Sequence, residues 1–238
     1  MKKILLLAIL LSSLYLMAQP PDRFIRYYYP EPNIGTRTDN IIATDYGYIL
    51  TGTAIDTIGI ETGYWKRCFI GVDFNGDVLW EKHYGDKDFW YASYVEMKNC
   101  FAKDDLDFYY YLSPVSKVRE PELHETFAQL LKMTKMGDTL WTKNYYGDEN
   151  YPFLILTNLN LLPDGGFALI GYTGIEMYEG SGILEEGHPC LLRIDKDGNE
   201  LWRQIYKNHM GYFYASSYDP ITYRYILVGY RYSFNPHR

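Results

Sequence analysis

The stretch Gly198-Asn199-Glu200-Leu201-Trp202 occurs three times in this chain and predicts its fold. Its earlier copies are Gly76-Asp77-Val78-Leu79-Trp80 and Gly137-Asp138-Thr139-Leu140-Trp141, so the tryptophans are 61 residues apart both times. A long period that is kept to the residue is typical of a repeat architecture. The copies share the glycine, the leucine and the tryptophan, which are residues that a turn and the packing between repeats require. The motif therefore predicts structure and says little about biochemistry.

Turn signals divide each repeat into four strand-like pieces rich in β-branched and aromatic residues. In the first repeat these pieces are Asn40–Thr44, Tyr48–Thr53, Cys68–Asp73 and Trp80–Tyr84. Four short antiparallel strands in a unit of this length are typical of a β-propeller blade. We expect an all-β propeller with apolar first strands near the axis and the tryptophans packed between blades. A solenoid stack is the alternative, although its coils are usually shorter.

The repeats also predict the domain boundaries. Residues 1–18 combine a basic start with an apolar run, which is typical of a secretory signal peptide. Residues 19–238 then form the propeller, with blades at about 38–84, 91–145 and 153–206, a half blade at 212–232, and an orphan outer strand at 23–29. These boundaries give about 3.5 blades. Because an open ring leaves exposed sheet edges, we expect either a fragment of a longer propeller, which we favour, or an irregular closure.

Charge and cysteine content exclude some classes of protein. The chain has 23 Lys and Arg against 30 Asp and Glu, and without Lys2 and Lys3 its net charge is −9. This acidic balance argues against a nucleic-acid or anionic-membrane surface. The 26 tyrosines suit half-buried sheet surfaces. Cys68, Cys100 and Cys190 are an odd number without close pairs, so we expect buried, unpaired thiols rather than a disulfide framework.

Two stretches carry a resemblance to a known family. Asp164 to Thr173 reads Asp-Gly-Gly-Phe-Ala-Leu-Ile-Gly-Tyr-Thr, and Arg193 to Trp202 reads Arg-Ile-Asp-Lys-Asp-Gly-Asn-Glu-Leu-Trp. Together with Tyr84-Gly85-Asp86 and Tyr146-Gly147-Asp148, they resemble the repeats of exported Bacteroidota β-propeller proteins, many of which carry a type IX secretion sorting domain. The resemblance implies a propeller and an extracellular, cell-surface or periplasmic location. It implies no particular activity.

The sequence contains no group of residues that indicates a particular reaction, and we expect no catalytic residues, metal or cofactor. Asp195-Lys196-Asp197-Gly198-Asn199 begins like a calcium loop, but Tyr206 stands where the loop needs a glutamate, so a hairpin turn is favoured. The five histidines lie at different repeat positions, and none has a metal-ligand spacing from another.

The remaining candidate is the face where the loops after the fourth strands would emerge beside the long second-to-third loops. The expected binding residues there are aromatic and acidic: Asp86, Asp88, Trp90, Tyr91, Asp148, Glu149, Tyr151 and Tyr212. Such a face suits a protein partner or a glycan, although simple packing at the blade mouth is the plainer interpretation. We therefore expect a non-enzymatic, exported interaction module. The alternatives are a quinoprotein-like enzyme or cofactor-holding propeller with its site on the central axis, and a carbohydrate-binding loop face.

Overall fold

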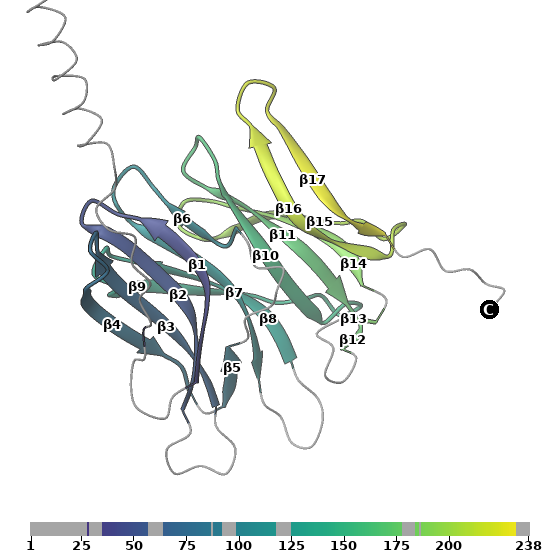
Figure 1. Ribbon diagram of the computed structural model, residues 1–238. Coiled ribbons are helices and arrows are strands. Elements are labelled where there is room, and N and C mark those ends of the chain that lie inside the picture. Colours follow the sequence, from purple (N-terminus) through teal and green to yellow (C-terminus); the bar gives the residue numbers. More distant parts are fainter. Residues whose placement is uncertain are drawn as a thin grey trace, which may run out of the picture.

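The computed structural model describes residues 28, 35–56, 64–86, 88–91, 99–117, 125–177, 184–185 and 187–231. Every regular element among them is a β-strand, which confirms the all-β prediction (Figure 1). The expected signal peptide and all of the expected outer strand except Tyr28 lie outside the described residues. Within the described ranges, no helix has the length and apolarity to cross a bilayer.

The strands form three large antiparallel sheets and two small ones, and the chain visits them in order (Figure 1). Sheet 1 contains β1 (Gly35–Ala43), β2 (Gly47–Asp56), β3 (Tyr64–Asp73) and β4 (Val78–Tyr84). Sheet 2 contains β5 (Phe89–Tyr91), β6 (Phe101–Lys103), β7 (Tyr109–Lys117), β8 (Glu125–Met133) and β9 (Thr139–Tyr145). Sheet 3 contains β10 (Phe153–Leu161), β11 (Phe167–Gly174), β14 (His188–Ile194) and β15 (Glu200–Ile205). Sheet 4 is the hairpin β16 (Gly211–Asp219) and β17 (Arg224–Arg231), and β12 (Glu176–Met177) pairs with β13 (Leu184–Glu185).

The predicted four-strand repeat is found in sheets 1 and 3, and the predicted half repeat is the two-stranded sheet 4. Sheet 2 differs from the prediction, because β5 and β6 both pair with β7 and together replace a single first strand. As a result Trp90 and Tyr91 lie in a strand, whereas the sequence placed them in a loop. The short pair β12–β13 also lies inside a stretch that was expected to be a loop.

The second strands of sheets 1, 3 and 4 share one irregularity. Gly52, Gly171 and Gly229 each stand where the register with the first strand shifts. A Cβ on Gly171 would overlap the backbone oxygen of Ile155, so only glycine lets the bulged first strand approach this closely. The recurring bulge aligns β17 with β2 and β11 residue by residue.

The repeated glycines occupy the third-to-fourth hairpin turns, with φ of +82° at Gly76, +79° at Gly137 and +80° at Gly198. Glycine tolerates this left-handed backbone without strain. In the third turn the Asp195 carboxylate accepts hydrogen bonds from the Asp197 and Asn199 amides, at 2.9 and 2.8 Å. These bonds lower the pKa of Asp195, the backbone bond from Asn199 having the largest effect. The hairpin interpretation of this stretch is therefore confirmed.

Contacts between neighbouring sheets repeat with the sequence period. The Tyr145 hydroxyl donates to the Gly198 carbonyl at 2.9 Å, and Tyr84 donates to Gly137 in the same way. The Tyr28 hydroxyl donates to the carbonyl of Gly76, the equivalent turn glycine of sheet 1, at 3.0 Å. The largest hydrophobic cluster draws residues from sheets 1, 2 and 3. The three cysteines are buried and form no disulfide bond with one another, as predicted.

Candidate functional site

The residues expected on the loop face lie in β5, in β16 and in the β4–β5 and β9–β10 connections. Trp90 is 43% exposed on β5, whereas Tyr91 turns toward sheet 1. The Asp86 carboxylate accepts the Asp88 amide, and the Asp148 carboxylate accepts the Asn150 and Tyr151 amides, so both acids stabilise their own turns. Exposed Glu149 lies in that second turn. The Tyr151 ring packs against His188, and the Tyr212 ring packs against Tyr172. These roles are structural, and they suit the plainer interpretation of the face.

Tyr91 belongs to a buried cluster around Arg67 that the sequence did not reveal. The Arg67 guanidinium carbon lies 5.1 Å from the centre of the Tyr91 ring and 5.4 Å from that of Tyr111. Its terminal nitrogens donate to Gln129 and Ser113 on sheet 2, while Nε has no hydrogen-bond partner. Burial lowers the pKa of Arg67, an effect that the two tyrosines oppose. Since the cluster joins β3 to sheet 2, its plain role is to hold the two sheets together.

A hollow of about 770 Å³ opens at the opposite end of the strands, among the turns of sheets 2, 3 and 4. Its lining includes Asp104, Lys132, Asn160, Asp197 and Tyr218. One Asp104 oxygen accepts the Leu106 and Phe108 amides and the other accepts the Tyr110 hydroxyl at 2.8 Å. The Lys132 ammonium lies 4.3 Å from the Phe108 ring centre. These two polar side chains are thus held by the local turn.

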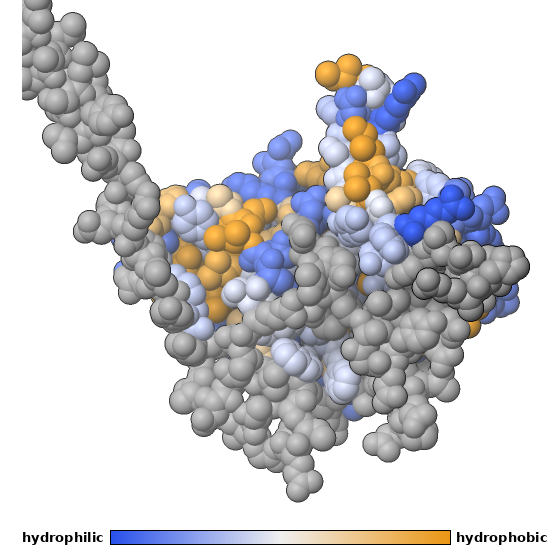
Figure 2. Space-filling model, turned by 45° about the vertical axis from the view of Figure 1, so that its right-hand side comes forward, coloured by the Kyte–Doolittle hydropathy of each residue, from blue (hydrophilic) through white to orange (hydrophobic). Residues whose placement is uncertain are grey.

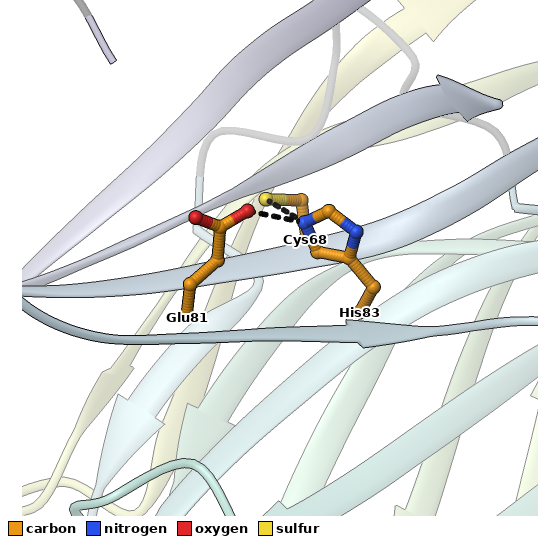
Figure 3. A group of neighbouring side chains, drawn as sticks. All are labelled: Cys68, Glu81 and His83. Atoms are coloured by element: carbon orange, nitrogen blue, oxygen red, sulfur yellow. Dashed lines mark hydrogen bonds and ion pairs between the residues drawn. The ribbon is translucent and has the colours of Figure 1, made fainter. Parts of the chain in front are cut away.

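Among the described residues, a group of possible metal ligands lies on sheet 1, where Cys68, Glu81 and His83 converge (Figure 3). Their nearest sulfur, oxygen and nitrogen atoms lie within 4.8 Å of one another. His83 Nε2 is 2.6 Å from Glu81 Oε1 and 3.4 Å from Cys68 Sγ. Glu81 and His83 are two residues apart on β4, so their side chains share a face, and the register pairs Cys68 with His83. Sulfur, imidazole and carboxylate are the donors that zinc takes in proteins.

The three side chains differ in their access to water. Cys68 is 5% exposed, whereas the side chains of Glu81 and His83 are 28% and 22% exposed. Burial, and to a lesser extent the Glu81 charge, raise the pKa of the Cys68 thiol to about 12. In the free protein the thiol is therefore protonated at neutral pH. The spacing of the histidines in the sequence does not indicate this group, because two of its three possible ligands are not histidines. The usable signal was Glu-x-His on a strand whose hairpin partner carries a cysteine.

The fold defines the broad class of this protein: an all-β repeat protein of successive antiparallel sheets. A scan against protein-family models and a search of curated proteins both find no match for this chain.

Proposed function

We propose that this chain is a β-propeller repeat protein that acts as an exported interaction module, and that it docks a strand of a partner polypeptide against β17. Support for the propeller comes from the 61-residue period and the strand order β1-β2-β3-β4 in a full repeat. Export rests on the N-terminal sequence and on the resemblance to exported propeller proteins.

The observation that carries the docking proposal is the exposed apolar surface of β17. Ile226, Val228 and Tyr230 alternate along this strand and are 60%, 50% and 52% exposed. Tyr225 and Leu227, on its other face, pack against sheet 3. Hydrophobic residues gather along the projecting β16–β17 hairpin (Figure 2). An apolar strand at a sheet edge is a ready acceptor for another chain.

The repeat indicates what should bind there. β17 aligns with β2 and β11, and both of those strands pair with a third strand of their own sheet. Among the described residues, β17 pairs only with β16. A peptide strand that adds to β17 on the side opposite β16 would gain main-chain hydrogen bonds and cover the apolar side chains. The expected occupant is therefore an extended segment with the character of a third strand.

The charge on β17 indicates which kind of residue should lie at one end of the bound strand. In sheet 1 the residue that pairs with Gly47 is Asp73, at the end of β3. Counted from the shared bulge, the β17 residue equivalent to Gly47 is Arg224, which is exposed. An acidic residue at the end of the incoming strand would therefore face an arginine. This complementarity favours an acidic-ended strand of a partner polypeptide over a second copy of β17, because antiparallel pairing of two copies would bring Arg224 close to Arg231.

The test is a charge swap across the proposed pair. The probe is a synthetic peptide with the sequence of residues 64–73 carrying Cys68→Ser, and fluorescence anisotropy measures its binding to the full chain. We expect saturable binding that weakens at least about fivefold with either Asp73→Lys in the peptide or Arg224→Glu in the protein, since a close charge pair contributes about 1 kcal/mol. The two changes together should restore binding. Glu200→Lys, a charge change on β15 of sheet 3, is the matched control and should leave the affinity unchanged.

Three results would overturn the docking proposal. The first is equal binding of the peptide to the wild type and the Arg224→Glu protein. The second is the absence of binding at millimolar peptide. The third is a dimer, seen by analytical ultracentrifugation, that Val228→Lys dissociates and that the peptide does not displace, because the occupant would then be a second copy.

An enzymatic function has less support. A site on the central axis would require polar side chains that are free to act on a substrate. Among the described features, the hollow between the turns of sheets 2, 3 and 4 comes closest to such a site. Its Asp104 and Lys132 are held by local contacts instead.

A further inference from the structure

We propose that Cys68, Glu81 and His83 form a binding site for a single divalent metal ion of the zinc class. The three side chains supply one thiolate sulfur, one carboxylate oxygen and one imidazole nitrogen from two adjacent strands (Figure 3). Three protein ligands leave the fourth tetrahedral position to water. The inference is independent of the proposed docking at β17.

The distances between the donor atoms suit a tetrahedral ion. Zn–S and Zn–N bonds of about 2.3 and 2.0 Å at a tetrahedral angle separate sulfur from nitrogen by roughly 3.5 Å. The separation of Cys68 Sγ from His83 Nε2 is 3.4 Å. The carboxylate oxygen should stand roughly 3.3 Å from the nitrogen, and the present hydrogen-bond distance between them is 2.6 Å. An outward movement of Glu81 by less than about 1 Å, through its flexible side chain, completes the geometry.

The other repeats show that the hairpin does not need these residues. The pair equivalent to Cys68 and His83 is Gln129 with Asn144 in sheet 2, joined by a 2.8 Å hydrogen bond. In sheet 3 it is Cys190 with Ile205. The position of Glu81 is taken by Thr142 and by Arg203. The same strand pairing thus accommodates a polar pair in sheet 2 and an apolar pair in sheet 3. Of the three large sheets, only sheet 1 has three types of metal ligand at these positions.

Binding requires the thiol to lose its proton. The ion displaces the Sγ–H proton to solvent as the Cys68–metal bond forms, and His83 binds as the neutral imidazole through Nε2. Glu81 Oε1 now lies within hydrogen-bond distance of His83 Nε2, and the carboxylate would exchange that contact for the metal. Because a proton is released, the affinity should rise with pH. A cation that prefers oxygen ligands, such as Mg²⁺, gains little from a thiol and should not compete.

The test uses Co²⁺ as a spectroscopic substitute for zinc. The full chain, reduced and freed of metal with a chelator, is titrated with Co²⁺ while the thiolate-to-cobalt charge-transfer band is recorded. We expect one equivalent of Co²⁺, an intense near-ultraviolet band, and loss of the band when Zn²⁺ is added but not Mg²⁺. Cys68→Ser should abolish the band, and His83→Asn should weaken binding by more than about 100-fold, since even ligand-orienting contacts contribute 10–100-fold.

Two further variants separate metal ligation from folding. The double variant Cys68→Gln/His83→Asn reproduces the Gln129–Asn144 pair that sheet 2 already accommodates, so it should keep the far-ultraviolet circular dichroism of the wild type and bind no cobalt. Cys190→Ser changes the equivalent cysteine of sheet 3 and should keep both the band and the affinity. A charge-transfer band that persists in Cys68→Ser, or that disappears equally in Cys190→Ser, would refute the assignment. Failure of the wild type to bind Co²⁺ or Zn²⁺ at millimolar concentration would also refute it.

Discussion

Replacing Trp80 with alanine should destabilise the protein more than replacing Trp202, although the two residues occupy the same position in the repeat. Trp80 is 9% exposed and its indole donates to the Tyr46 hydroxyl at 3.0 Å, which in turn donates to the Lys135 carbonyl at 2.7 Å. The chain of bonds crosses from sheet 1 to sheet 2. A Cβ on Gly137 would lie 2.5 Å from the Trp80 ring, so the indole packs directly on that turn. Trp202 is 46% exposed.

The expected cost follows from this difference in burial. Trp80→Ala leaves a cavity between two sheets, for which about 3–5 kcal/mol is typical, and we expect about 4 kcal/mol. Trp202 keeps roughly half of its surface in water, so Trp202→Ala should cost about 1.5 kcal/mol. At about 3 °C per kcal/mol for a chain of this size, Tm should fall by about 12 °C for Trp80→Ala and by about 4.5 °C for Trp202→Ala.

The assay is thermal unfolding of the full-length proteins, followed by far-ultraviolet circular dichroism, because tryptophan fluorescence changes with the substitutions themselves. Trp80→Phe, which retains a ring at the junction, serves as a milder variant and should fall between the wild type and Trp80→Ala. Equal losses of Tm for Trp80→Ala and Trp202→Ala would show that the sheets do not pack through the repeated tryptophan.

Two other outcomes follow from particular residues. In urea unfolding, Gly137→Ala should destabilise the protein by at least about 1 kcal/mol more than Gly165→Ala. Both glycines have φ near +80°, but a Cβ at 137 would meet the Trp80 ring, whereas the nearest atom to a Cβ at 165 is 3.7 Å away. Equal costs would mean that backbone strain alone matters. Burial raises the pKa of Cys68 and Cys190 to about 12, so both thiols should resist iodoacetamide at pH 8 until the protein unfolds, as mass spectrometry would show. Because the thiol pKa values are higher in the folded than in the unfolded protein, the protonated thiols contribute to the stability of the fold. This contribution is complete below about pH 8.5 and is lost as the pH rises toward 12. Rapid alkylation of the native protein would contradict the raised pKa values.

Much of the fold could be predicted because turn glycines and hydrophobic pattern act locally. The alternation after Trp80 fixes which side chains of β4 share a face, and a glycine with positive φ fixes the hairpin before it. The divided first strand of sheet 2 could not be predicted, because β5 pairs with the far half of β7, as Phe89 does with Lys117, and no short-range pattern indicates that contact. Arg67 was missed for a similar reason. Its partners Ser113 and Gln129 lie on another sheet, and no short-range pattern indicates them.

The metal ligands show how one local irregularity decides a site. Next to the turn, Val72 pairs with Val78, and a regular hairpin continued from that pair would place Cys68 opposite Lys82. A β-bulge between Gly71 and Val72 shifts the register by one residue and brings Cys68 opposite His83 instead.

The same shift recurs between Lys132 and Met133 in sheet 2 and between Arg193 and Ile194 in sheet 3, so the bulge belongs to the repeat and not to the site. The repeat thus provides one cross-strand position in every large sheet, and the side chains placed there determine its chemistry. If sheet 1 binds a metal ion through Cys68 and His83, then Gln129→Cys/Asn144→His together with Thr142→Glu should transfer cobalt binding to sheet 2. The transferred site would have to show the same thiolate band, because the repeat presents the same backbone register there. Failure of this transfer, with the sheet 1 site intact, would mean that the surroundings of sheet 1 contribute more to the site than the register does.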